Sequence, residues 1–152
     1  MTSLHLPDKA LLQHWLDESG VEHYLCGQCE GLHLRALQET PGVIDSRLFQ
    51  EEYGLLLTTE LELRPAMVLQ VAAELGRFNM DYPTLKVFID VVDEALPQLV
   101  VAASFPSVAG VAPEQFAHFI ATTLEATGHL ADSCRQLDYL YPAAEQAPTM
   151  LH

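Results

Sequence analysis

Apolar residues recur three or four positions apart in three stretches of the chain, the spacing of one face of a helix. The first stretch runs from Pro7 to Gly20, the second covers residues 67–78 and ends before Pro83, and the third begins near Pro113. Proline fits the first turn of a helix, and glycine or proline commonly follows the last turn. The pattern therefore predicts three α-helices.

Extended segments lie between these helices. Residues 43–49 and 53–63 are separated by a short charged stretch, and residues 84–92 and 99–105 by a stretch of similar length. Connections this short join antiparallel strands, because parallel neighbours need a crossover of about a dozen residues or more. A turn at residues 26–29 separates two shorter extended pieces, so we expect an antiparallel sheet.

The alternation of side chains within two strands predicts which face of the sheet is buried. Leucines assigned to the core alternate with residues of a wetter face, Leu56, Thr58, Glu60 and Glu62. The residues assigned to the core face in the two strands are Leu55, Leu57, Leu61, Leu63, Leu85, Val87, Ile89 and Val91. One face of the sheet is therefore expected to meet water.

The order of the elements predicts an α+β fold, an antiparallel β-sheet with three α-helices in the order α-β-β-β-α-β-β-α. We assign residues 1–140 to a single domain and residues 141–152, which are rich in Pro and Ala, to a loose C-terminal tail. A chain of 152 residues with 49% hydrophobic residues is long enough to bury a core of its own.

Charge narrows the classes of partner. The chain has 7 Lys and Arg against 21 Asp and Glu, a net charge of -14, and no basic run that could displace counterions from nucleic acid. Residues 1–9 lack the pattern of a signal peptide, and no apolar run approaches the length of a membrane span. We therefore expect a cytoplasmic protein with no direct nucleic-acid binding and no membrane insertion, and with protein partners.

The sharpest local feature is Cys26-x-x-Cys29, because two thiols at this spacing can chelate a metal ion or form a redox pair. A zinc site needs further ligands, for which His23, His33 and Cys134 are candidates. A second Cys-x-x-Cys is missing, and no predicted helix follows the pair to lower a thiol pKa. The favoured interpretation is two small apolar side chains that shape a hairpin; a metal site and a redox pair stay open.

Motifs of catalysis are missing from the sequence. The seven histidines show no His-x-x-x-His spacing, no serine lies in a Gly-x-Ser-x-Gly turn, and there is no Gly-rich phosphate loop. Glu60 and Glu62 share a strand face, which a solvated surface explains more simply than an acid–base pair. The sequence therefore predicts no catalytic residue, no resident metal and no cofactor.

The second helix is apolar on more than one side. One side is expected to pack on the sheet. Leu69, Ala72, Ala73 and Gly76 make a second surface of mostly small residues, which another helix could approach closely. These four residues are candidates for a homodimer interface.

Short segments along residues 1–123 resemble the YbjN proteins of enterobacteria in order and spacing. The segments are Met1-Thr2-Ser3-Leu4, Gln13-His14-Trp15-Leu16-Asp17, Cys26-x-x-Cys29 with Leu32-His33-Leu34, Gly42-Val43-Ile44-Asp45, Arg64-Pro65-Ala66-x-Val68-Leu69, Leu85-Lys86-Val87-Phe88-Ile89-Asp90, Leu96-Pro97-Gln98-Leu99-Val100-Val101 and Glu114-Gln115-Phe116-Ala117. Many matches in register are more specific than any single motif.

This resemblance implies a fold similar to the small acidic chaperones of type III secretion. It also implies a role in regulating sensory transduction, with effects on motility, surface polysaccharide and stress tolerance, and it brings no agreed biochemical activity. In those chaperones the middle helix builds the homodimer, so Met67 joins the dimer candidates by analogy. An extended effector segment binds along their sheet, which makes Leu56, Thr58 and Val100 candidate partner contacts.

Two hypotheses of function follow. The first is a non-enzymatic bacterial regulator that binds another protein, as a chaperone or an adaptor does. The alternative is a metal- or redox-responsive sensor that uses the Cys26/Cys29 pair.

Overall fold

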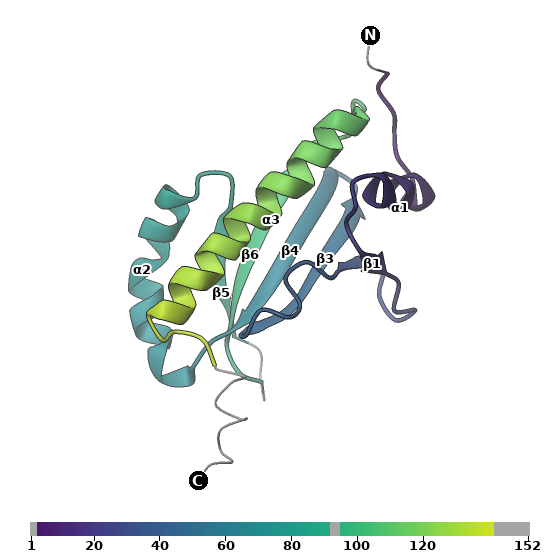
Figure 1. The fold of residues 1–152 in the computed structure, drawn as a ribbon. Coiled ribbons are helices and arrows are strands. Elements are labelled where there is room, and N and C mark those ends of the chain that lie inside the picture. The colour runs from purple at the N-terminus through teal and green to yellow at the C-terminus, as the bar shows by residue number, and fades with distance from the viewer. Residues whose placement is uncertain (1–2, 92–94, 142–152) are drawn as a thin grey trace.

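The fold is an antiparallel sheet with helices on one side, as a computed structural model that describes residues 3–91 and 95–141 shows (Figure 1). The elements are α1 (Lys9–Glu18), β1 (His23–Tyr24), β2 (Leu32–Leu34), β3 (Val43–Glu51), β4 (Gly54–Glu62), the 3-10 turn η1 (Pro65–Met67), α2 (Val68–Asp81), β5 (Lys86–Asp90), β6 (Gln98–Phe105) and α3 (Pro113–Gln136). The strands lie in the order β1-β2-β3-β4-β6-β5, and every neighbouring pair is antiparallel. The predicted α+β class is confirmed, with one strand more than expected because both arms of the turn at residues 26–29 pair.

Helices α1 and α3 begin where side chains accept hydrogen bonds from nearby backbone N–H groups. Asp8 precedes α1, and its carboxylate accepts the N–H of Leu11 at 2.8 Å. At the start of α3, the side chain of Gln115 accepts the N–H of Ala112 at 2.9 Å. These caps place the helix starts within two residues of the predicted ones.

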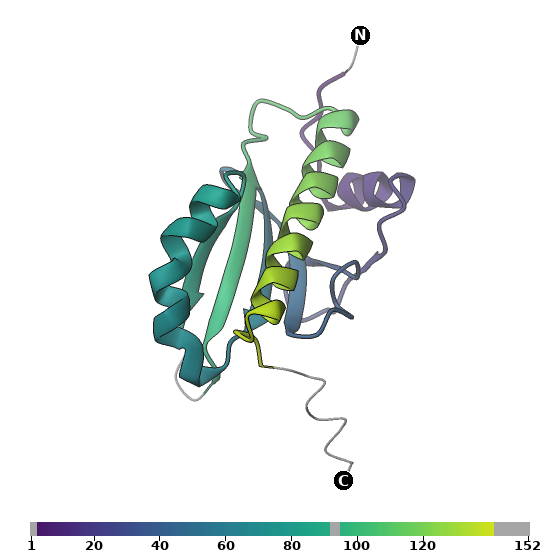
Figure 2. The ribbon, with the colours of Figure 1, turned by 60° about the vertical axis from the view of Figure 1, so that its left-hand side comes forward.

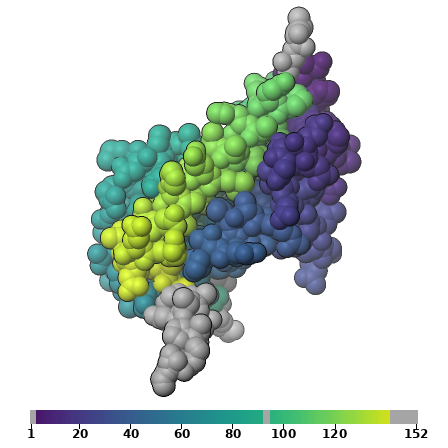
Figure 3. Space-filling model, viewed as in Figure 1, coloured from purple at the N-terminus to yellow at the C-terminus, as the bar shows by residue number. Residues whose placement is uncertain are grey.

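One face of the sheet is covered by helices and holds the core. Figure 1 shows α3 crossing the sheet, and Figure 3 shows the same side closed by α2, α3 and α1. Leu55, Leu57 and Leu61 of β4 lie on this face and are at most 1% exposed. Between them, the hydroxyl of Thr59 lies 2.7 Å from that of Ser46 on β3, so the buried polar pair satisfies itself.

Helix α2 lies beside the edge strand β5 (Figure 2). The side chain of Asn79 accepts the N–H of Val87 and donates to the carbonyl oxygens of Val87 and Leu75. An exposed strand edge offers unpaired N–H and C=O groups to other chains. Asn79 occupies one such pair on β5, and thereby also ties α2 to the sheet.

The other face of the sheet is open. One row of neighbouring residues runs across its six strands, from Tyr24 and His33 through Arg47 and Thr58 to Ala102 and Lys86. The predicted alternation on β4 is confirmed, since Leu56, Thr58, Glu60 and Glu62 are all partly exposed. Val91 departs from its predicted core position and is 69% exposed, because it lies beyond Asp90, the last residue that β5 pairs with β6.

The chain after α3 returns to the sheet. The N–H of Tyr141 donates to the carbonyl of Glu62 at 2.8 Å. Residues 142–152 of the predicted tail lie outside the described residues. Among the residues that are described, no helix combines the length and apolarity needed to cross a bilayer.

Candidate functional site

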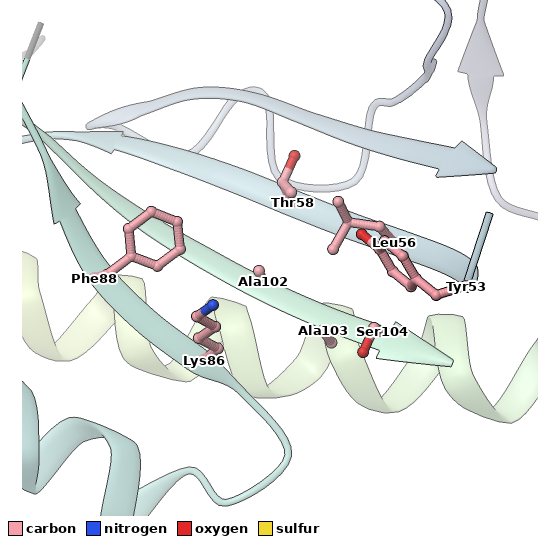
Figure 4. Close-up of a pocket in the computed structure, with 8 residues that line it drawn as sticks. All are labelled: Tyr53, Leu56, Thr58, Lys86, Phe88, Ala102, Ala103 and Ser104. Carbon is pink, nitrogen blue, oxygen red and sulfur yellow. The ribbon is translucent and has the colours of Figure 1, made fainter. Parts of the chain in front are cut away.

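A shallow groove of about 380 Å³ lies on the open face of the sheet. Leu56 of β4 and Phe88 of β5 stand on its two sides, with Ala102 of β6 between them and Lys86 beside Phe88 (Figure 4). Tyr53, from the turn before β4, lies next to Leu56. Tyr53 is 52% and Phe88 38% exposed, so two aromatic side chains offer apolar surface to solvent on this face.

The candidate partner contacts fall in different places relative to this groove. Leu56 and Thr58 line it. Val100 does not line it and is 8% exposed, between Glu60 of β4 and Phe88 of β5 in the strand register. The structure thus brings two of the three predicted residues together, and adds Tyr53, Lys86 and Phe88.

Charged side chains continue the open face from the groove toward β1 and β2. Arg47 donates to Glu60 at 2.7 Å, and Asp45 lies 3.9 Å from Arg47. Burial lowers the pKa of Arg47, but this effect is outweighed by groups that raise the pKa. They are Glu60, through its charge and a hydrogen bond, then Cys29 and the charge of Asp45. The net effect is a pKa above the ordinary value. Glu60, weighed above as one of an acid–base pair, is held in this ion pair.

The predicted cysteine turn connects β1 and β2 and places three ligand atoms together. Cys26 Sγ lies 3.4 Å from Cys29 Sγ, which lies 3.3 Å from His33 Nε2. The ligand atoms of these three residues all lie within 4.8 Å of one another. Cys26 is exposed, Cys29 partly buried and His33 only 7% exposed.

The five candidate metal ligands therefore do not form one site. Cys134 is buried on α3, on the covered side of the sheet, and is not part of the group. His23 is also outside it, since its Nδ1 lies 3.0 Å from the carbonyl oxygen of Val21 and its Nε2 3.7 Å from Asp17.

The two kinds of cysteine environment shift the thiol pKa in opposite directions. The N–H of Gln28, then the His33 and Cys29 side chains, lower the pKa of Cys26 to about 6 by stabilising the thiolate. Burial raises the pKa of Cys134 to about 12, against a weaker opposing effect of Arg77. The reactive thiol therefore belongs to the turn, and Cys134 is an inert core residue.

The candidate dimer residues do not share one surface, because four of them are exposed on α2 and Met67 of η1 faces the core. Leu69 is 85% exposed, and Ala72, Ala73 and Gly76 are exposed with it. Met67 instead packs partly buried against the core. A homodimer built on this surface stays a prediction, which the mass of the protein in solution would check.

Sequence reasoning missed the residues that orient His33. Asp45 Oδ2 lies 2.9 Å from His33 Nδ1, while Asp45 Oδ1 accepts from Gln38 Nε2 and from the N–H of Ser46, both at 2.8 Å. Tyr24 stacks on the His33 ring, with centroids 4.7 Å apart. Asp45 lies twelve residues from His33, so no local spacing could have indicated the contact.

Comparison with known proteins matches one family over most of the chain. Residues 8–136 match the family model YbjN, described as "Putative bacterial sensory transduction regulator". The YbjN proteins of Escherichia coli (strain K12) and Shigella flexneri are each 39% identical over 120 residues, which cover 79% of this chain and 76% of theirs. A crystal structure of YbjN, "a putative transcription regulator from E. coli", superposes with a TM-score of 0.89 at 34% identity, over 93% of this chain and all of that one.

Proposed function

This chain belongs to the YbjN family, and we propose from that membership and its surface that it is a non-enzymatic regulator of the bacterial cytoplasm. It acts by binding an extended segment of another protein, as an adaptor or a chaperone does. The observation that carries the proposal is the groove on the open face, where Tyr53, Leu56 and Phe88 present apolar surface that no described helix covers.

The face of the sheet suits such a segment better than its edges do. On β5 the Asn79 side chain occupies the N–H and C=O of Val87, which an added strand would need. At the opposite edge, β1 has only two residues. A bound segment would therefore lie across the face, with apolar side chains beside Leu56 and Phe88.

Charge selects among possible segments. The protein carries a net charge of -14, which speeds encounter with basic surfaces and repels nucleic acid. Glu60 and Glu62 lie along β4 beyond the groove. The segment we propose has one or two large apolar residues flanked by Lys or Arg. Any effect on transcription would then be exerted through a protein partner.

Site-specific photocrosslinking in living cells tests the proposal. A photoreactive amino acid at position 56 or 88 should give a discrete crosslinked product. The same group at position 108 is the matched control, because Val108 is apolar, 64% exposed and outside both the groove and the candidate dimer surface. Once the partner segment is identified, Phe88→Ser should weaken its binding at least about tenfold, since an aromatic anchor commonly contributes more than 1 kcal/mol.

Two results would contradict the proposal. One is the same set of products from positions 56, 88 and 108, which would mark non-specific contact. The other is an identified partner that Phe88→Ser and Leu56→Ser bind as tightly as the unchanged protein does. Both substitutions lie on the open face, so circular dichroism should show an unchanged fold.

A further inference from the structure

We propose that Cys26, Cys29 and His33 bind a thiophilic divalent metal ion, Zn²⁺ above all, and that Asp45 positions His33 for it. The site lies on the same open face as the groove, but it does not depend on the proposed protein binding. Three features support it, namely the geometry of three side chains, the contact by which Asp45 holds the histidine, and the shape and charge of the turn.

The separations of the ligand atoms fit a tetrahedral ion. With zinc bonds of roughly 2.3 Å to sulfur and 2.0 Å to nitrogen, two sulfurs lie about 3.8 Å apart, and sulfur and nitrogen about 3.6 Å apart. The two distances found here are 3.4 Å between Cys26 Sγ and Cys29 Sγ and 3.3 Å between Cys29 Sγ and His33 Nε2. The ligand atoms of all three residues lie within 4.8 Å of one another, so shifts of about 1 Å or less would admit the ion.

The histidine is held with its metal-binding nitrogen toward the thiols. The Asp45 carboxylate accepts the Nδ1 proton at 2.9 Å, so Nε2, which lies 3.3 Å from Cys29 Sγ, is the ring nitrogen available to a metal. Any proton that Nε2 donates to the thiolates in the metal-free protein would be displaced when the ion binds. A carboxylate behind the other ring nitrogen is the usual outer partner of a metal-bound histidine. Gln38 and the Ser46 N–H fix Asp45, and Tyr24 stacks on the ring, so the orientation precedes any ligand.

The turn itself is shaped for two thiolates. Gly27 has a φ of +79°, which other residues rarely adopt, and this bend brings the two cysteines face to face. The N–H of Gln28 donates to Cys26 Sγ at 3.3 Å. Arg47 supplies a positive charge that interacts favourably with Cys29. These groups favour the deprotonated sulfurs that a metal requires.

Three protein ligands leave the fourth tetrahedral position to water or to a ligand from outside. A zinc site that serves only the fold is normally closed by four protein ligands. Since Cys26 is exposed, the ion would be reached directly from solvent. Binding should therefore be reversible, and the fold should persist without metal, because the core lies on the other side of the sheet.

The test is titration of reduced, chelator-stripped protein with Co²⁺ and then Zn²⁺ under anaerobic conditions. Co²⁺ alone should bind one equivalent and produce thiolate-to-cobalt charge-transfer absorption together with the intense visible bands of tetrahedral coordination. One equivalent of Zn²⁺ should displace it. Asp45→Asn should weaken Zn²⁺ binding by about 10 to 100-fold with an unchanged circular dichroism spectrum.

Matched variants separate the site from other ligands in the chain. The double substitution of Cys26 and Cys29 by Ser, and His33→Gln, should each abolish the charge-transfer band or strongly reduce it. Cys134→Ala and His23→Gln remove a thiol and an imidazole outside the group and should bind as the unchanged protein does.

The proposal is overturned if the reduced protein binds no saturable equivalent of either metal at micromolar concentration. It is also overturned if binding survives the double cysteine substitution. A protein that takes up no metal when reduced, but loses two hydrogen masses in air as Cys26 and Cys29 join, would instead have a redox pair. Crosslinking at positions 56 and 88 can succeed or fail whatever these titrations show.

Discussion

The two faces of the sheet give neighbouring side chains of the same strand opposite environments, one buried and one exposed to solvent. On β4, Leu57 is fully buried beneath the helices, while its neighbour Thr58 lies on the open face and lines the groove. The covered face is a continuous apolar core, and the open face carries a polar network, a groove and a pair of thiols. Substitutions on the first should therefore change stability, and substitutions on the second should change binding and reactivity.

The largest difference between the faces is expected in thiol chemistry. Cys26, with a pKa of about 6, is roughly nine-tenths ionised at pH 7, whereas Cys134, with a pKa of about 12, is ionised only to about one part in 10⁵. In metal-free protein, iodoacetamide should modify Cys26 at least about 10²-fold faster than Cys134, because the lower nucleophilicity of a low-pKa thiolate offsets part of the difference in ionisation. Peptide mass spectrometry over time measures both rates.

The rates of modification of the two thiols should also depend differently on pH. A lowered pKa means that the rate of Cys26 modification should be flat above pH 7 and fall about tenfold per unit below pH 6. Cys134 should react only in denaturant, because burial both protonates and shields it. Comparable modification of both thiols in the folded protein would remove the contrast between the two environments.

The next largest effect is on stability. Leu57→Ala should lower the free energy of unfolding by about 2–5 kcal/mol, because it removes buried methyl groups and leaves a cavity under α3. Leu56→Ala is the matched control on the same strand and should cost less than about 1 kcal/mol. Urea unfolding followed by circular dichroism measures both, and equal losses would mean that the open face is covered in solution.

A smaller loss in the free energy of unfolding is expected where α2 meets the edge of the sheet. Asn79→Ala removes three hydrogen bonds and leaves the N–H and C=O of Val87 without that partner, a cost of about 1–3 kcal/mol. Met80→Ala, one residue further and 73% exposed, should cost under about 0.5 kcal/mol. Hydrogen exchange at the Val87 amide should accelerate in the first variant and stay unchanged in the second.

The smallest effect is expected for the ion pair of the open face. Arg47 and Glu60 lie 2.7 Å apart but remain about one-quarter and one-fifth exposed, so solvent screens their attraction. A double-mutant cycle with Arg47→Met and Glu60→Gln should give a coupling below about 1 kcal/mol that falls with added salt. A coupling of several kcal/mol would place the pair in a drier environment than the open face offers.

The sequence predicts the covered face of the sheet better than it predicts the open face. The alternation of Leu55 and Leu57 with Leu56 and Thr58 predicts the buried side of β4, and the structure confirms it. The same argument places Val91 wrongly, because alternation carries no information beyond the last paired residue of a strand. The groove escaped prediction because its residues come from three strands and a turn.

For the cysteine turn, the sequence supplied three of the ligand candidates that the structure brings together, Cys26, Cys29 and His33. It also offered Cys134, which the fold removes to the core. No spacing rule could choose between these residues, since a metal site depends on positions in space. Asp45, which decides the tautomer of His33, gave no signal at all in the sequence.

The sequence by itself determined the kinds of element, their order and the face that each buries, because these follow from side-chain periodicity and from local breakers such as proline and glycine. Only the tertiary structure decided the strand register, and with it the contact of His33 with Asp45. It also decided how α2 docks beside β5, which joins Asn79 to Val87. The physical reason is that register results from the packing of the whole covered face. Residues on the open face are brought together by that packing, whatever their own separation along the chain.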